Sequence, residues 1–380
     1  MYKFKEIQDG NLARKQSELS KLFVHEFMGE IALEWTDLIR SSIERRHRLV
    51  IFEVYRNTEF IGIAILLLVK KLKMTQWKPA APFFRFFGSV DVGFIEIPLA
   101  NMSGILTRKD IKNNERENIV NALCDYIRRT IYIDVLFIKT NNSVDQCNEP
   151  LLLHNMLSLP FYPNTLLKYP YTSFDEYLSG ITRKKYRRCL SDRKKMKDGK
   201  GRIEIVHEIS TVHEEIYALY RKTSEQAKKK QNYIEMPVQI NKKFFQNIDG
   251  FEGLQPCVAT VVVEGKIIAY CLLLQSGRTL FVKSVGLDYC SSYQTKAYFN
   301  LFYAALEYAG RQQCNKVDFG ITGYQFKQWL GCELIPTAYL CRSFNPIISF
   351  LSKPLSFFAE RIIRSDMPDQ SKPLCIGRKK

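Results

Sequence analysis

The hydrophobic pattern predicts two β-hairpins, one in each half of the chain. In the first, Leu49–Tyr55 and Phe60–Val69 are rich in β-branched and aromatic residues and flank a polar turn. In the second, Cys257–Val263 and Ile267–Leu274 have the same character and flank the turn Glu264–Lys266. Apolar runs of this length on both sides of a short polar turn are typical of paired strands.

The same order of elements surrounds both hairpins. Apolar residues at three- to four-residue spacing predict helices, and short β-branched runs predict strands. Around the first hairpin we predict a helical region at 1–46, strand material at 83–99, a helix at 110–130 and a strand at 131–138. Around the second we predict helices at 211–230, 238–248 and 293–310 and strands at 279–287 and 316–320. The repeated order indicates an internal duplication of an α/β unit. The alternative is chance similarity between generic α/β segments.

The length of the chain also predicts two domains. A chain of 380 residues exceeds the size at which a single hydrophobic core stops growing, about 250–300 residues. We assign 1–170 to an N-terminal domain, 171–345 to a C-terminal domain and 346–380 to an amphipathic tail. The C-terminal domain opens with a basic connector helix at 173–200.

The net charge of +17 is concentrated in this connector. Between Arg183 and Arg202 there are eleven Lys and Arg residues and two Asp, a net +9. Focused charge of one sign attracts an anionic partner: the phosphates of a nucleotide cofactor, a tRNA or an anionic lipid surface. The alternative is a solvated helix face. The residues that we expect at an anion site are Arg183, Lys184, Arg187 and Arg188.

Composition and motifs exclude several classes of protein. The chain is 46% hydrophobic and 25% charged, which is typical of globular rather than disordered proteins. The ten cysteines include no C-x-x-C pair, and the five histidines show no metal-binding spacing. We therefore predict neither a disulfide framework nor a metal site, and we interpret the cysteines mostly as small buried side chains in a reducing compartment.

No segment of the sequence predicts export or insertion into a membrane. The N-terminus lacks the layout of a signal peptide. The longest apolar run, Phe60–Val69, has ten residues, about half of the ~20 that a membrane-spanning helix needs. Residues 346–364 interleave apolar and basic side chains, which fits docking on the protein's own core or contact with a membrane surface. We expect a cytoplasmic protein, with peripheral contact with the inner face of the membrane left open.

Four separated segments of the second half resemble one known family. They are Ser173–Arg188, Glu215–Thr223 followed by Phe244 and Phe245, Val285–Tyr289, and Asp318–Gly320 followed by Tyr324, Lys327 and Gly331. In this order, over roughly residues 173–345, they resemble the BioF2-like and CelD-type GNAT acetyltransferases. That family is similar to the FemAB peptidyltransferases, which carry two GNAT-like domains and take aminoacyl groups from tRNA. The duplicated order of elements agrees with either.

The resemblance implies a fold and a reaction. The expected fold is α/β, with two tandem GNAT-like (acyl-CoA N-acyltransferase) domains of mixed, mostly antiparallel sheets flanked by helices, the first of them degenerate. The expected enzyme is an acyltransferase that moves an acyl group from acyl-CoA, or another acyl thioester, to an amine of a small-molecule, lipid-linked or cell-envelope precursor acceptor. In the GNAT fold two neighbouring strands splay, a backbone amide there polarises the thioester carbonyl, and a loop at a helix N-terminus holds the pyrophosphate. Acyl-CoA is the implied co-substrate, and no metal is implied.

The phosphate loop departs from the usual GNAT pattern. GNAT enzymes carry Q/R-x-x-G-x-G/A where this chain has Cys290–Ala297, which lacks the glycines that let the backbone approach a phosphate. This departure weakens the expectation of conventional CoA binding. As phosphate-binding residues we predict Ser292, Gln294, Thr295 and Lys296 of this loop, together with Arg187.

The candidate catalytic residues follow two of the predicted strands, 279–287 and 316–320. The resemblance implies that Asp288 is a general base or holds the amine, and that Tyr324 is a general acid. Asp318 ends a strand, a position that opens on the ligand crevice in α/β sheets. For substrate binding we predict Tyr289, Tyr298 and Lys327. The alternative for each of these residues is structural: a cap, a turn or surface packing.

Three functions therefore stay open. The first is acyl transfer from a thioester to an amine, and the second is a FemAB-type transfer from aminoacyl-tRNA, which the basic connector would suit. The third is a non-catalytic protein that binds nucleic acid or a lipid surface through its basic stretch. Asp134 occupies the place of Asp318 in the first half but lacks the Tyr and Lys that follow. We therefore interpret the first half as structural or acceptor-shaping.

Overall fold

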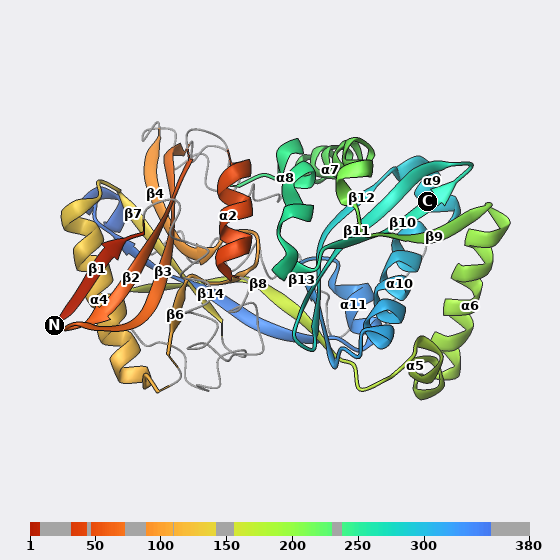
Figure 1. Cartoon of the computed structure of the whole chain (residues 1–380), viewed down its shortest axis with the longest axis horizontal. Helices are drawn as coiled ribbons and strands as arrows, with labels where there is room; N and C mark the ends of the chain where they lie inside the picture. The colour runs from red at the N-terminus through yellow and green to blue at the C-terminus, as the bar shows by residue number, and fades with distance from the viewer. Residues whose placement is uncertain are drawn as a thin grey trace.

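The computed structural model of the chain describes residues 1–7, 32–43, 47–72, 89–108, 110–141, 156–229 and 238–350. Within these residues the strands form one continuous mixed sheet of 14 strands, with helices on both faces (Figure 1). The order across the sheet is β1-β2-β3-β4-β7-β14-β8-β13-β12-β11-β10-β9, with β5 beside β4 and β6 beside β3. The predicted α/β class is confirmed.

The bounds of the elements are as follows. The N-terminal half contains β1 (Tyr2–Glu6), α2 (Ala32–Ser42), β2 (His47–Arg56), β3 (Glu59–Leu72), β4 (Val90–Ile97), β5 (Met102–Ser103), β6 (Ile105–Thr107), α4 (Asn113–Thr130), β7 (Val135–Asn141) and β8 (Leu157–Lys168). The C-terminal half contains α5 (Phe174–Gly180), α6 (Arg183–Asp198), β9 (Gly201–Val206), α7 (His213–Lys228), α8 (Lys242–Asn247), β10 (Cys257–Val263), β11 (Lys266–Ser276), β12 (Thr279–Leu287), α9 (Tyr289–Gln294), α10 (Ala297–Arg311), β13 (Lys316–Gly320), α11 (Tyr324–Leu330) and β14 (Glu333–Ser343).

Most of the predicted elements are confirmed. Both hairpins form, β2 with β3 and β10 with β11. The helix predicted at 293–310 is two helices, α9 and α10, because the chain takes a left-handed conformation at Lys296 (φ 53°). The prediction of helix at the very start of the chain is wrong: Tyr2–Glu6 is a strand that pairs with β2. The amphipathic tail beyond residue 350 lies outside the described residues.

Six strands were not predicted from the sequence: β1, β5, β6, β8, β9 and β14. β8 contains Pro160 and Pro163, and proline within a run argues against a central strand because it cannot donate to the ladder. The register between β14 and β8 shifts between Ile335 and Thr337, next to Pro163, and this irregularity accommodates the proline.

The two halves exchange their last strands. β8, from the N-terminal half, lies between β14 and β13, and β14, from the C-terminal half, lies between β7 and β8. In Figure 1 both strands cross the middle of the molecule and join the halves on either side. Each half of the sheet is therefore completed by a strand of the other half.

One hydrophobic core spans both halves on the face of the sheet that carries α2, α7 and α8. Trp35 of α2 packs edge-on against Phe244 of α8, with ring centroids 5.7 Å apart. The indole Nε1 of Trp35 also donates to the carbonyl of Pro98 at 2.7 Å. Helices of the two halves thus share one buried interface.

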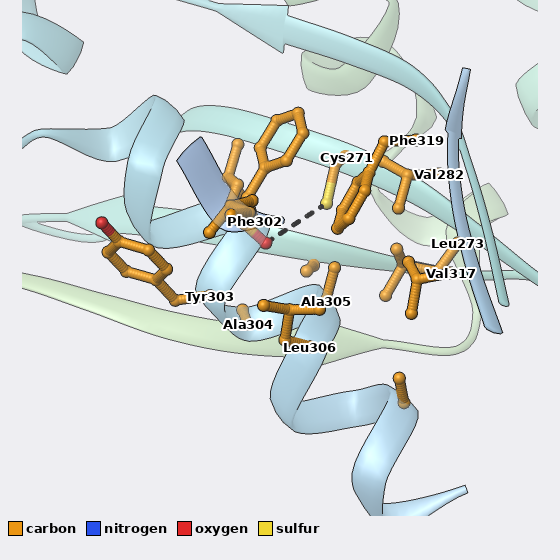
Figure 2. Close-up of a cluster of buried hydrophobic side chains, with 14 of the residues drawn as sticks. Cys271, Leu273, Val282, Phe302, Tyr303, Ala304, Ala305, Leu306, Val317 and Phe319 are labelled. Carbon is orange, nitrogen blue, oxygen red and sulfur yellow. Dashed lines mark hydrogen bonds between the residues drawn. The ribbon is translucent and has the colours of Figure 1, made fainter. Parts of the chain in front are cut away.

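The opposite face carries a separate core in each half. α4 covers the N-terminal half, and α10 covers β11, β12 and β13 in the C-terminal half. Figure 2 shows the second core, where Phe302 of α10 stacks on Phe319 of β13 with centroids 4.9 Å apart. The thiol of Cys271 donates to the carbonyl of Leu301 there at 3.8 Å. Of the described cysteines seven are buried and only Cys290 is exposed, as expected for small hydrophobic side chains.

Because the halves share a core and exchange strands, we expect them to unfold in one transition. In a Trp77→Phe background, adding Trp329→Phe leaves Trp35 to report on the N-terminal half, and adding Trp35→Phe leaves Trp329 to report on the other. Fluorescence in urea should give the same midpoint for both reporters, and two separated midpoints would contradict a shared core. Trp35→Ala should lower the free energy of unfolding by about 3–5 kcal/mol, whereas alanine at the exposed Phe350 should change it little.

Candidate active site

β12 and β13 run parallel and separate part-way along their length. They pair as far as Phe281 and Asp318, beyond which β12 continues beside β11 and β13 beside β8. At the same point β12 carries a β-bulge, where Lys283 and Ser284 lie opposite the single residue Leu272. A bulge takes backbone groups out of the regular ladder. The strand pair therefore opens beyond Phe281 and Asp318.

A buried carboxylate and an amide occupy this opening. Asp318 is fully buried; its Oδ1 accepts from the backbone N–H of Gly320 at 2.7 Å and its Oδ2 from Nδ2 of Asn164 at 2.8 Å. Asn164 belongs to β8, so the strand exchange brings it here. The hydrogen bond that Nδ2 donates to Asp318 leaves Oδ1 as the free acceptor of the amide. Oδ1 of Asn164 is buried and has no hydrogen-bond partner within the described ranges.

Lys283 adds a cation from the bulge of β12. Its Nζ donates to the carbonyl of Ala100 at 3.1 Å, in the turn that links β4 and β5 of the other half. Burial lowers the pKa of Lys283, and the electrostatic interaction with Asp318 partly opposes that effect. The opening thus combines a cation, a carboxylate and an unpartnered amide oxygen from three strands. Neither Asn164 nor Lys283 was predicted as a site residue.

Lys327 and Tyr324 support the loop after β13. Nζ of Lys327 is buried and donates to the carbonyls of Phe319, Gly320 and Ile321. Burial is the main cause that lowers the pKa of Lys327 to about 7. The hydroxyl of Tyr324 donates to the carbonyl of Pro163 at 3.0 Å. Both side chains are engaged with backbone, and their roles toward a substrate stay predictions.

The predicted phosphate loop folds into the short helix α9. Asp288 caps it by accepting from the backbone N–H of Cys290 at 3.3 Å, and pairs with Lys222 at 3.0 Å. The hydrogen bond from Lys222 is the main cause that lowers the pKa of Asp288, which makes it a weaker base than an ordinary carboxylate. The hydroxyls of Ser292 and Thr295 donate to the carbonyls of Ile268 and Ser291. These predicted phosphate ligands are thus engaged within the fold.

The remaining candidates around this loop are more accessible. Gln294 and Tyr289 are exposed, and Nζ of Lys296 lies 4.2 Å from the ring centroid of Tyr293. Arg187 lies on α6 with its side chain exposed. The structure does not bring Arg187 and Asp318 into contact, and the role of each stays a prediction.

Aromatic rings fill the side of the opening that faces α10. The ring of Tyr298 lies 4.8 Å from that of Phe302 and 5.8 Å from that of Phe326, and Phe302 stacks on Phe319. Burial raises the pKa of Tyr298. These rings belong to the hydrophobic core beneath α10.

α6 packs beside α10 and presents a cationic surface. Nine of its 16 residues are Lys or Arg. The guanidinium of Arg188 lies 5.0 Å from the ring centroid of Phe299 and 5.3 Å from that of Trp329. Tyr186 of α6 and Tyr293 of α9 are among the exposed aromatic side chains. Cations and exposed aromatic rings therefore occur together on this part of the surface.

Comparison with known proteins agrees with this geometry. A family model of FemAB-like proteins, described as peptidoglycan biosynthesis/recognition, matches residues 97–345. The chain belongs to the FemAB-like family. No curated protein matches the sequence of this FemAB-like protein.

Solved structures share the fold of the FemAB-like protein at low sequence identity. A tandem GNAT protein from the clavulanic acid biosynthesis pathway is 10% identical, with 91% of this chain and 99% of that chain covered and a TM-score of 0.51. FemX is 12% identical, with 88% and 97% covered and a TM-score of 0.53. The tandem GNAT-like fold is thereby confirmed, and family and fold together support a transferase of the acyl or aminoacyl kind.

The FemAB-like protein has a second opening in its N-terminal half. β4 and β7 pair in parallel as far as Ile95 and Ile138, and the next residues, Glu96 and Lys139, are buried. Tyr339 of β14 donates to the carboxyl group of Glu96. Burial raises the pKa of Glu96, and the hydrogen bond with Tyr339 acts against this.

The ammonium of Lys139 is enclosed by rings and one hydroxyl. Its Nζ lies 3.8 Å from the ring centroid of Phe161 and 4.4 Å from that of Tyr339, and it donates to Oγ1 of Thr337 at 3.3 Å. Burial lowers its pKa to about 7. Asp134 lies apart from this cluster and accepts from the backbone N–H of Asp91 at 2.9 Å.

Two features of the described residues bear on cofactors and membranes. No group of His, Cys, Asp and Glu among them is arranged to hold a metal ion. None of the described helices has the length and apolar character that crossing a bilayer requires.

The buried lysine of the N-terminal half predicts a dependence of stability on pH. The unfolded lysine titrates near 10.5, whereas burial brings the native pKa of Lys139 to about 7. Between these values the unfolded chain binds one more proton, so stability rises with pH through this window. We expect Lys139→Met to raise the melting temperature by about 2–4 °C at pH 6.5 and by less at pH 9.

The control is Lys168→Met, since Lys168 is exposed and paired with Glu333 at 3.0 Å. Melting temperatures measured from pH 6 to pH 9 should run parallel to the wild type for this variant. If the Lys139→Met curve also runs parallel, Lys139 does not titrate in this range.

Proposed function

We propose that this FemAB-like protein forms an amide at the opening between β12 and β13 by transferring an aminoacyl group from tRNA to an amine of a cell-envelope precursor. The observation that carries the proposal is the unpartnered, buried Oδ1 of Asn164 beside Asp318 and the cation Lys283. An acceptor for an N–H group and a cation for a carbonyl oxygen are what amide formation needs.

The residues of the opening divide the chemistry between them. Oδ1 of Asn164 accepts an N–H from the attacking amine, and Asp318 acts through Asn164 as a positioning residue. Lys283 and the backbone of the bulge stabilise the negative charge that develops on the carbonyl oxygen. The amine nitrogen bonds to the carbonyl carbon, the ester bond to the ribose oxygen breaks, and the proton of the amine passes to that leaving oxygen.

The surroundings of the opening favour RNA as the carrier of the donor group. The loop that would cradle a diphosphate folds as α9, and its Ser292 and Thr295 hydroxyls bind backbone carbonyls. By contrast, α6 carries nine Lys and Arg residues and the exposed ring of Tyr186. This combination is suited to a phosphate backbone with accessible bases.

Acyl-CoA is a second candidate donor. It is favoured by the splay of β12 and β13 and by the N-terminus of α10, where Lys296 makes no side-chain cap and the first backbone N–H groups can face an anion. With this donor the same steps apply, and the C–S bond of the thioester breaks instead of the ester bond.

The choice of acceptor rests on the family. The matching family is described as peptidoglycan biosynthesis/recognition, and a precursor peptide of that polymer carries a free amine. A lipid-linked form of such a precursor fits the basic tail that the sequence predicts.

Transfer of label tests the proposal and separates the donors. We expect the purified protein to move radiolabelled amino acid from a pool of aminoacyl-tRNAs to peptidoglycan precursors, with loss of transfer after RNase treatment. Acyl-CoAs of increasing chain length form the parallel arm. The variant Lys184→Glu with Arg187→Glu should raise the KM for tRNA several-fold at low salt and less at high salt. Transfer from acyl-CoA alone would overturn the RNA donor, and transfer from neither would favour a non-catalytic binding protein.

Asn164 provides the sharpest test of the opening itself. Asn164→Leu should lower kcat/KM for the acceptor about 10²-fold or more and leave the KM for the donor unchanged, because the amide contacts only the amine. Asp318→Asn should have a smaller effect in the same direction, since it loosens Asn164. Gln275→Leu is the matched control, because its Oε1 is also buried without a partner within the described ranges but lies near the far end of β11. An equal loss in both leucine variants would mean a general effect on folding.

A further inference from the structure

A groove lies between α6, β9 and α10, on the face of the sheet away from α7 and α8. Its volume is about 760 Å³, within the range of small-ligand sites, ~300–1,000 Å³. The floor is mainly apolar and is formed by Met196, Ile203, Tyr303 and Ala304. Charged side chains of α6 and β9 form the rim.

The rim carries cations that the protein itself leaves uncompensated. Arg193 pairs with Glu307 at 3.3 Å and Arg202 with Glu204 at 2.6 Å. The side chains of Lys194 and Lys197, three residues apart on α6, make no hydrogen bond or ion pair with other described residues. Two free ammonium groups therefore lie beside an apolar floor.

The groove leads to the N-terminus of α10. Asn300, in the first turn of that helix, lines the groove, and its Nδ2 donates to the carbonyls of Thr295 and Lys296. Gly199, at the end of α6, packs so closely on Thr295 that a Cβ there would lie 2.9 Å from its methyl group. The groove therefore borders the first turn of α10, the end of a helix that favours negative charge.

We propose that this groove binds a phosphorylated nucleoside of the activated donor. The base lies on the apolar floor, its amino edge faces the carboxylates of Glu307 and Asp198, and its phosphates lie along Lys194 and Lys197 toward α10. Both carboxylates line the groove, and they disfavour a lipid phosphate with an acyl chain, which has no donor groups for them. The inference rests on the proposed function. Two donors carry such a phosphorylated nucleoside: the single-stranded end of a tRNA and free coenzyme A.

Equilibrium binding tests the groove without requiring transfer activity. The probes are adenosine 3′,5′-bisphosphate, coenzyme A and a fluorescent oligonucleotide that ends in CCA, each titrated against the full chain at fixed salt. We expect at least one probe to bind, and Lys194→Glu with Lys197→Glu to weaken it by tenfold or more. Lys243→Glu with Lys266→Glu changes the net charge equally at exposed positions outside the groove and should weaken binding less than threefold. In lysine acetylation footprinting, the bound probe should protect Lys194 and Lys197.

The two sources of the ligand give different patterns. Binding of the oligonucleotide alone assigns the groove to RNA, whereas binding of the bisphosphate and coenzyme A assigns it to the thioester donor. Equal affinity in both double variants, or no binding of any probe to the wild type, would overturn the inference. Preferential binding of anionic lipid vesicles through Lys194 and Lys197 would overturn it as well. Nucleotide binding without amide formation would support the groove as a binding site and contradict the proposed function. Amide formation without nucleotide binding in the groove would support the proposed function and contradict this inference.

Discussion

The exchange of β8 and β14 is the constraint on which the rest of the structure depends. A strand needs a partner for its backbone groups, and β13 and β7 each find theirs in the last strand of the other half. The same exchange delivers Asn164 to Asp318, and Lys283 reaches in turn to Ala100 of the N-terminal half. The opening in the C-terminal half is thus built from both halves, and neither half could form it alone.

The two openings differ in how they satisfy their buried polar groups. In the N-terminal half, Tyr339 bonds the carboxyl group of Glu96, and Lys139 has Thr337 and two ring faces. In the C-terminal half, Oδ1 of Asn164 has no partner within the described ranges. An unpaired buried acceptor costs about 1–3 kcal/mol, a cost that an N–H donor of a bound substrate would remove. This difference favours chemistry at the opening of β12 and β13 and a structural role for the other.

Local sequence patterns predicted the elements whose formation depends mainly on residues nearby in the sequence. Both hairpins, α4 and α10 follow from apolar periodicity and turn composition, whereas the connector helix predicted at 173–200 is two helices, α5 and α6. β8 and β14 did not, because prolines interrupt β8 and both strands pair with residues far away in the sequence. The site was predicted in part for the same reason. Asp318 was named from its position at a strand end, but nothing in the sequence marks Asn164, whose role depends on a strand that the pattern does not show.

The missing glycines and the basic helix α6 have one physical explanation. A glycine-rich loop presents backbone N–H groups to a diphosphate in one fixed geometry. Here Asp288 caps α9 instead, and the first part of that loop, up to Gln294, is helical. In the function proposed here, the long Lys and Arg side chains of α6 bind the anion, and they can reach phosphates at varied positions. A flexible set of cations suits the phosphate backbone of an RNA better than the single diphosphate of a small cofactor.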